Sequence, residues 1–397
     1  MKNKRLLLIG GVAGITLFTI VGCGSQPNVA PQNKTTAESS MNNTPSNTAK
    51  GNATNTVTQP SSSTQSQMPA LTSINMVNSK TGWATGHNSV WFTKDGGVSW
   101  TQVTPKGLRA SSNLQMKVYG IGDKNAWVAT SDTSSISNPL SIYYTSNGGQ
   151  TWVKQGIHDA GDPMSLHFRD QNHGWIALMQ GAAMGSERET IYQTNDGGAT
   201  WNKIAVTNDV KGGTLPFCGD KTGVSFIDNK HGWATGFTPA NGHVYLYKTT
   251  DDGKDWVSQT LSVPSSVKGA QFTSYPPLFF GHQDGILPVS SGAELVAYRT
   301  TDGGKRWVPG KVVRSTVQNP AIQAWSFPTM NNGFATDGDK MFTTTDSGQT
   351  WTSFTSNIPL KNVTTMQFVS STDGWAVIST GALYRTTDGG HTWSKMN

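Results

Sequence analysis

Three glutamates are the residues of this 397-residue chain best suited to acid–base chemistry: Glu187, Glu189 and Glu294. Two carboxylates on either side of a cleft can cleave a glycosidic bond, one as the acid and the other as the base or nucleophile. Further acids and amides stand in a phrase that occurs seven times, Thr-x-(Asp/Asn)-x-Gly-x-x-Trp, at Asp95, Asn147, Asp196, Asp251, Asp302, Asp346 and Asp388. Which of these groups could meet a substrate depends on the elements that carry them.

The repeated phrase has the composition of a tight turn. The Asp or Asn at its third position can accept hydrogen bonds from backbone N–H groups of the turn that follows. Glycine at the fifth position supplies the positive φ that a tight bend needs, and the final tryptophan buries a large apolar surface. We therefore predict a structural role for all seven acids and amides, and we assign no catalytic residue.

The spacing of the phrase predicts the architecture. Successive copies lie roughly 40 to 55 residues apart, a period typical of repeat proteins. Most repeats also hold a short apolar strand that opens with Gly-Trp, such as Gly82-Trp83 and Gly374-Trp375, whereas Asp284-Gly285-Ile286 in the fifth repeat has no aromatic residue. Four short strands per repeat predict an all-β fold, a seven-bladed β-propeller of four-stranded antiparallel blades over residues 69–397.

Closure of such a ring has two alternatives. Blades one and seven could pack against each other directly, or residues near Met68 to Thr72 could add a strand to blade seven. One of the two is required, because an open array would leave sheet edges exposed.

The phrase resembles the Asp-box, or BNR repeat, of sialidases, some glycoside hydrolases and several non-enzymatic propellers. Together with the Gly-Trp strands, the seven copies most resemble the photosystem II stability and assembly-factor-like propellers. The resemblance implies that the boxes are hairpins at the blade periphery, away from the face that binds ligands. It also implies a non-enzymatic scaffold or assembly-type factor that binds a protein or peptide. A membrane protein complex awaiting assembly would be such a partner.

An enzymatic alternative stays open. A sialidase is disfavoured, because the chain has no Arg-Ile-Pro element, which sialidases usually carry early in the propeller. A carbohydrate-binding or glycan-hydrolysing propeller would use Glu187, Glu189 or Glu294. All three are expected in connections between second and third strands, where the simpler interpretation is a solvated charge on a loop.

Long connections are the predicted binding surface. Segments 202–222 and 257–275 are the longest links between blades, and 131–141 and 180–190 enlarge loops within blades. Long loops on a rigid scaffold are where binding is usually placed. The candidate binding-face residues are Arg109, Glu187, Arg188, Glu189, Tyr275, Glu294 and Arg314.

Charge and composition exclude other partners. The net charge is +6, but Lys2, Lys4 and Arg5 at the start supply three of these charges, and the repeat region is close to neutral. A nucleic-acid partner is therefore not expected. The eight histidines form no cluster with ligand spacing, so we expect neither a metal nor another cofactor.

The N-terminal region has the pattern of a signal peptide followed by a lipidation site. A basic start and an apolar stretch over residues 1–22 predict a signal peptide. The ending Ile20-Val21-Gly22-Cys23 resembles the lipobox of bacterial lipoproteins, which implies lipidation of Cys23 and a location at the outer face of the cytoplasmic membrane. An uncleaved membrane anchor is the alternative. Residues 23–68, rich in Ser, Thr, Asn and Pro, are predicted to be a disordered tether.

Overall fold

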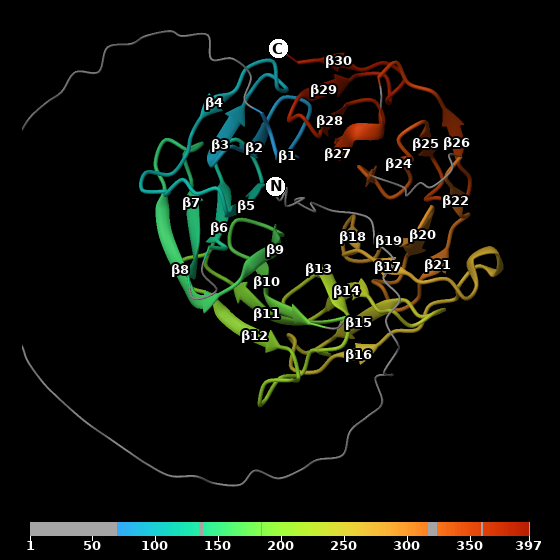
Figure 1. Ribbon diagram of the computed structural model, residues 1–397, viewed down its shortest axis with the longest axis horizontal. Coiled ribbons are helices and arrows are strands. Elements are labelled where there is room, and N and C mark those ends of the chain that lie inside the picture. Colours follow the sequence, from blue (N-terminus) through green and yellow to red (C-terminus); the bar gives the residue numbers. More distant parts are fainter. Residues whose placement is uncertain (1–69, 135–137, 184, 317–323, 359, 397) are drawn as a thin grey trace, which may run out of the picture. The chain divides into compact units, whose positions relative to one another are not determined.

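The computed structural model describes residues 70–134, 138–183, 185–316, 324–358 and 360–396 (Figure 1). The predicted signal peptide, Cys23 and the tether lie outside these residues. Apart from two short 3-10 turns, η1 (Ser265–Val267) and η2 (Leu360–Asn362), every regular element in the described segments is a β-strand. The all-β prediction is confirmed.

The strands follow one another in antiparallel units, and each unit runs from the centre of the ring outwards (Figure 1). Units one to three are β1 (Ser73–Met76), β2 (Gly82–Gly86), β3 (Ser89–Thr93), β4 (Thr101–Gln102); β5 (Leu114–Gly120), β6 (Ala126–Asp132), β7 (Pro139–Thr145), β8 (Val153–Ala160); β9 (Asp162–Phe168), β10 (Gly174–Ala183), β11 (Ser186–Thr194), β12 (Asn202–Val206). Units six and seven are β23 (Ala324–Ser326), β24 (Gly333–Thr336), β25 (Met341–Thr344), β26 (Thr352–Phe354); β27 (Val363–Phe368), β28 (Gly374–Ile378), β29 (Leu383–Thr386), β30 (Ser394–Lys395).

Units four and five are joined, which the sequence did not indicate. Their strands are β13 (Asp220–Phe226), β14 (Gly232–Phe237), β15 (Tyr245–Thr249), β16 (Val257–Ser258), β17 (Thr273–Ser274), β18 (Leu278–Phe279), β19 (Gly285–Ser291), β20 (Glu294–Thr300), β21 (Val308–Pro309) and β22 (Val313–Arg314). The short strand β17 pairs with β14 on one side and with β19 on the other, so one ten-stranded sheet results. Part of the long link 257–275 is therefore a strand.

Burial explains why the second strand of each unit is apolar. The β2 strand is buried at all five positions, whereas β1 alternates between partly and fully buried residues. Second strands are covered on both faces by neighbouring units, so they read as continuous apolar runs. Trp83, Trp127, Trp175, Trp233 and Trp375 of these strands are among the largest fully buried side chains.

Each repeated phrase forms a hairpin turn closed by its own side chains. In the third unit, Thr194 Oγ1 donates to Asp196 Oδ1 at 2.8 Å, and the Gly198 N–H donates to Thr194 Oγ1 at 2.8 Å. The Thr200 N–H then donates to the same carboxylate oxygen at 2.8 Å. In the second unit, Asn147 accepts the matching bond from the Thr151 N–H at 3.0 Å. The carboxylates of the phrase are thus occupied by their own turns.

The ring closes by packing of units one and seven. The Met76 N–H donates to Gln367 Oε1 at 2.7 Å, and Gln367 Nε2 donates back to the Met76 carbonyl at 3.0 Å. Trp375 Nε1 donates across the junction to the Gly96 carbonyl at 2.8 Å. The seventh sheet is complete with its own fourth strand, β30. No strand is added to the seventh sheet by the described residues, although the Leu71 N–H donates to the Gly381 carbonyl of unit seven at 2.9 Å. Within the described part of the chain, the first of the two closures is therefore observed, with this one bond from the segment of the second.

Candidate functional site

The chain path divides the ring into two faces. In each unit, the turn between the first and second strands and the repeated phrase lie at one end, which we call the box face. The hairpin between the second and third strands and the link to the next unit lie at the other end, which we call the loop face. The candidate residues of the long connections belong to elements that meet at the loop face.

The third unit carries the longest hairpin of the loop face. Strands β10 and β11 pair from Gly174–Thr194 to Ala183–Ser186, so segment 180–190 is largely strand. The following link folds back onto this hairpin, because the Thr207 N–H donates to the Glu189 carbonyl at 3.0 Å and the Glu187 N–H donates to the Phe217 carbonyl at 3.3 Å. The link therefore covers the two glutamates of β11.

Glu187 and Glu189 are buried, so the expectation of solvated loop charges is wrong for both. Their exposed fractions are 4% and 0%, and Lys221 of β13 beside them is 3% exposed. The Lys221 N–H donates to Glu187 Oε2 at 2.5 Å. Lys221 Nζ donates to the carbonyls of Glu187, Phe217 and Gly219 at 2.8, 2.7 and 2.8 Å. The cluster joins the third unit to the fourth, and its glutamates are shielded from solvent.

The pKa values in this cluster follow from burial. Burial and, to a smaller extent, the neighbouring Glu187 charge raise the pKa of Glu189 to about 8 against the opposing effect of Lys221. Burial likewise lowers the pKa of Lys221 to about 8 against the attraction of the two glutamates. Both carboxyl oxygens of Glu189 are buried with no hydrogen-bond partner among the described residues. Glu189 is therefore largely uncharged near neutral pH.

The arginines of the loop face remain at the surface, and two of them are paired. Arg188 Nε donates to Asp209 Oδ2 at 2.8 Å, and the Arg188 side chain is 48% exposed. Arg314 contacts Glu294 at 2.6 Å, with the arginine 62% and the glutamate 15% exposed. Arg109 is exposed in the link between the first and second units. Glu294 is thus held in an ion pair at the start of β20.

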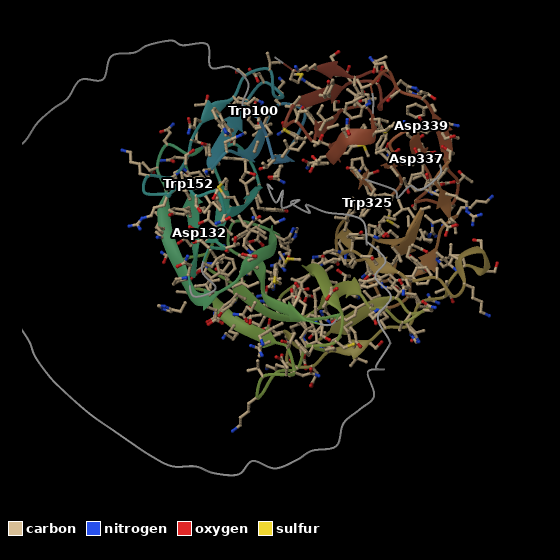
Figure 2. All side chains as sticks on the ribbon, in the orientation of Figure 1. Trp100, Asp132, Trp152, Trp325, Asp337 and Asp339 are labelled. Carbon is tan, nitrogen blue, oxygen red and sulfur yellow. The ribbon has the colours of Figure 1, made fainter. Side chains whose placement is uncertain are left out.

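Tyr275 is placed differently from the arginines. It is half-buried, and its ring lies edge-on to Trp325 of the sixth unit, with 4.4 Å between the ring centres. Trp325 lies closer to the centre of the ring than Trp100 or Trp152 of the repeated phrases (Figure 2). Tyr275 therefore joins units five and six through its ring contact with Trp325.

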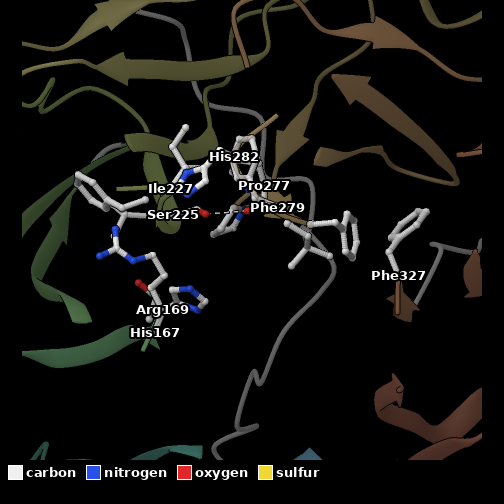
Figure 3. A pocket seen from close by; sticks show the side chains of 15 residues that line it. His167, Arg169, Ser225, Ile227, Pro277, Phe279, His282 and Phe327 are labelled. Carbon is white, nitrogen blue, oxygen red and sulfur yellow. Dashed lines mark hydrogen bonds between the residues drawn. The ribbon is translucent and has the colours of Figure 1, made fainter. Parts of the chain in front are cut away.

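A cavity that sequence reasoning missed lies between the first strands of units three to five. Its volume is about 440 Å³, and its wall includes His167, Arg169, Ser225 and Phe279, with Phe327 of the sixth unit opposite (Figure 3). The wall combines residues far apart in the chain, so no single motif marks it. A weak signal was present, because the fifth repeat lacks the usual aromatic residue in its second strand and carries Pro276-Pro277 before its first.

The described segments also lack two other features that would suggest a function. No group of three or more His, Cys, Asp or Glu side chains is placed to hold a metal ion there. Among the same residues, no helix has the length and apolar character needed to cross a membrane.

Comparison with known proteins agrees with this fold. The family model described as Sortilin-Vps10 (sortilin, neurotensin receptor 3) matches residues 88–222 and 295–397, which is more than half of the chain. The photosystem II assembly lipoprotein Ycf48 of Synechococcus sp. (strain CC9902) is 25% identical over 176 residues. That match spans 43% of this chain and 44% of the relative, less than half of its length.

Two solved structures share the fold. The structure titled "YCF48 bound to D1 peptide" superposes with a TM-score of 0.55 and 16% identity, over 81% of this chain and 92% of the other. An ancestral GH74 enzyme superposes with a TM-score of 0.52 and 12% identity, over 83% of this chain and 46% of the other. At such identities the likeness shows the fold alone. The chain belongs to the Sortilin-Vps10 family, and it is an Asp-box β-propeller similar to the Ycf48 photosystem II assembly-factor propellers.

Proposed function

We propose that this propeller is a non-enzymatic, protein-binding factor of the assembly type, which recognises a segment of a partner protein at its loop face. The observation that carries the proposal is that the arginines of that face are exposed to solvent while its glutamates are buried or ion-paired. Glu187 and Glu189 are buried and Glu294 is ion-paired, while Arg109, Arg188 and Arg314 reach solvent. Carboxylates that cannot meet a substrate do not support hydrolysis, whereas surface arginines are typical of protein contacts.

The partner class rests on the relatives. One similar structure holds a D1 peptide, and the similar Synechococcus protein is named as a photosystem II assembly lipoprotein. We extend from these only the class of role: binding of a peptide segment from a membrane protein that awaits assembly. Nothing in the chain links it to photosynthesis itself. Carbohydrate binding or cleavage is the alternative, and the GH74 likeness of fold is its support.

The test is recovery of a partner from detergent-solubilised membranes with the propeller as bait. A variant that combines Arg188→Ala with Arg314→Ala should recover at least about ten-fold less partner, because such contact arginines often contribute more than 1 kcal/mol. Arg306→Ala is the matched control, since Arg306 belongs to the box face and also pairs with an acid, Asp302, at 3.0 Å. Equal recovery by both variants would contradict the proposed face.

A glycan panel tests the alternative. Turnover of any glycan that disappears on Glu294→Gln would replace the binding function by hydrolysis. Glu294 is the acid to change because it is the one of the three glutamates with appreciable exposure, 15% of its side chain.

We also propose that Cys23 carries the lipid that holds the propeller at the outer face of the cytoplasmic membrane. The lipobox-like ending before Cys23 supports it, and the similar Synechococcus protein is named a lipoprotein. A Cys23→Ser variant should lose incorporation of an alkyne-tagged fatty acid and move to the soluble fraction. Retention of that variant in the membrane would favour the uncleaved anchor.

A further inference from the structure

The cavity between units three to six has the chemistry of a ligand site on a different part of the propeller from the loop-face arginines. We propose that it binds a carboxylate with an apolar, aromatic body. The carboxylate would meet Arg169 and its neighbours, and the body would lie against Leu278, Phe279 and Phe327. This inference does not depend on the proposed partner-binding function.

Strand geometry explains how the polar wall forms. Along β9 and the residue that follows it, Leu166 and Phe168 are buried in the core between the units, while the alternate residues Ser165, His167 and Arg169 line the cavity. Alternate residues of a strand point to opposite sides, so one short strand supplies all three polar groups. The strand therefore presents two hydrogen-bonding side chains and one cation in a row.

The apolar wall comes from the next two units. Leu278 and Phe279 of β18 line the cavity together with Pro276 and Pro277. Ser225 Oγ donates to the Pro277 carbonyl at 2.7 Å, which ties this proline segment to β13 (Figure 3). Leu278 is 40% exposed, an unusual exposure for a leucine that lines a cavity. An apolar ligand body would cover it and gain the corresponding hydrophobic free energy.

The charged side chains that line the cavity favour a negatively charged ligand. None of the 15 lining residues is an Asp or Glu, while Arg169, His167 and His282 are among them. Burial lowers the pKa of His167 to about 4, so this ring is a neutral hydrogen-bonding group at neutral pH. The single strong cation is Arg169. A ligand carboxylate would share Arg169 with Asp170, the acid that pairs with it just outside the cavity wall.

Arg169 makes two weak contacts, with Asp170 and with the Trp175 ring, whose centre lies 5.9 Å from the guanidinium carbon. Its Nε lies 3.3 Å from Asp170 Oδ2, a long and partly exposed ion pair of little strength. Asp170 is already engaged by the N–H groups of Asn172 and His173, at 2.8 and 2.9 Å. Figure 3 shows the Arg169 guanidinium beside Ser225 and Ile227 at one side of the cavity. If Arg169 turns to a ligand carboxylate, Asp170 therefore keeps its hydrogen bonds from the backbone.

A buried hydroxyl in the same wall supports a polar ligand. Ser165 Oγ is buried and has no hydrogen-bond partner within the described segments. Buried polar groups in proteins are nearly always satisfied, so this donor suits an oxygen that enters the cavity. The volume of about 440 Å³ lies within the range of small-molecule pockets.

The experiment is a calorimetric or NMR titration of the full chain with 3-phenylpropionate, and with its uncharged amide as the matched ligand. The acid should bind saturably and the amide about ten-fold more weakly, because the contact with charged Arg169 is lost. Arg169→Gln should bring the acid down to the affinity of the amide. Leu278→Ala, at an exposed position that should not disturb folding, should weaken acid and amide alike by about three- to ten-fold, the loss of part of an apolar contact.

Controls make the result decisive. Arg306→Gln, at an arginine of the repeated phrase in unit five, should leave binding unchanged. Absence of saturable binding, or equal binding to wild type and Arg169→Gln, would overturn the proposal. A short peptide ending in phenylalanine, compared with its C-terminal amide, then distinguishes a free small carboxylate from a chain terminus. Either source agrees with the same site chemistry.

Discussion

The carboxylates of the box face and those of the third unit are both desolvated to some extent, but their pKa values shift in opposite directions. Asp388 of the seventh phrase is partly desolvated, which would raise its pKa, but hydrogen bonds from Thr392 and Thr386 lower the pKa to about 2. Glu189 has no such donors, and burial raises its pKa to about 8. A carboxylate that accepts hydrogen bonds from its own turn is ionised, and its environment is set by residues close in sequence. One buried by a distant segment is neutral and depends on tertiary structure.

The strongest test of this contrast is removal of the cation in the third-unit cluster. Lys221→Met should lower the free energy of unfolding by about 3–5 kcal/mol, because it leaves three carbonyls without their donor and takes the cation away from Glu187. Chemical denaturation measures the change. As a control, Lys230→Met, at an exposed lysine of the fourth unit, to which Lys221 also belongs, should change the free energy of unfolding by less than about 0.5 kcal/mol. A small effect at Lys221 would mean that the cluster is not structural.

The pH dependence of stability should differ between the two sets of acids. The pKa of Glu189 rises from 4.5 to about 8 on folding, so its stabilising contribution is complete below pH 4.5 and is lost as pH rises towards 8. We therefore expect the free energy of unfolding to fall as pH rises through this window, with the charge of Lys221 already included in the pKa of Glu189. Lys221 acts in the opposite sense above pH 8, because its folded pKa lies below 10.5.

The variant that isolates this effect is Glu189→Gln. In the variant, the fall in stability between pH 4.5 and 8 should disappear, which leaves the rise up to about pH 6.5 that the lowered pKa of His167 predicts. Asp388→Asn should leave that slope intact, because the lowered pKa of Asp388 affects stability only between about 2 and 3.8. An unchanged slope in Glu189→Gln would show that another group carries the dependence.

A smaller effect is expected from a single turn of the box face. Asp346→Ala removes the acceptor of the Thr350 N–H and hydroxyl bonds, at 2.9 and 2.5 Å, and of the Thr344 bond at 2.7 Å. The expected loss is about 1–2 kcal/mol, since the freed groups can turn to water. Asp346→Asn should cost less, because Asn147 already fills this role in the second unit. Equal losses for the two variants would show that charge, rather than geometry, stabilises the turn.

The same contrast explains what could be predicted from the sequence. The phrase from Thr194 to Trp201 contains both partners of its hydrogen bonds within eight residues, so its fold follows from the local pattern. Lys221 lies 34 residues from Glu187, and no spacing rule joins them. The link that covers the two glutamates was expected as an open loop, yet it pairs back onto β11 through residues 207 and 217. The cavity was missed for the same reason, because its wall draws on four units.

The smallest stability effect is expected at the loop-face ion pair of Glu294 and Arg314. With the arginine 62% exposed, the pair is screened by solvent, so Arg314→Ala should change the free energy of unfolding by less than about 1 kcal/mol. Partner recovery should nevertheless fall, because the variant loses the contact that the exposed guanidinium makes with the partner. A thermal melt alongside the pull-down measures both. If Arg314→Ala unfolded the propeller, Glu294 and Arg314 would belong with the buried third-unit cluster. If it altered binding alone, the charged side chains of the loop face would contribute to partner binding rather than to stability.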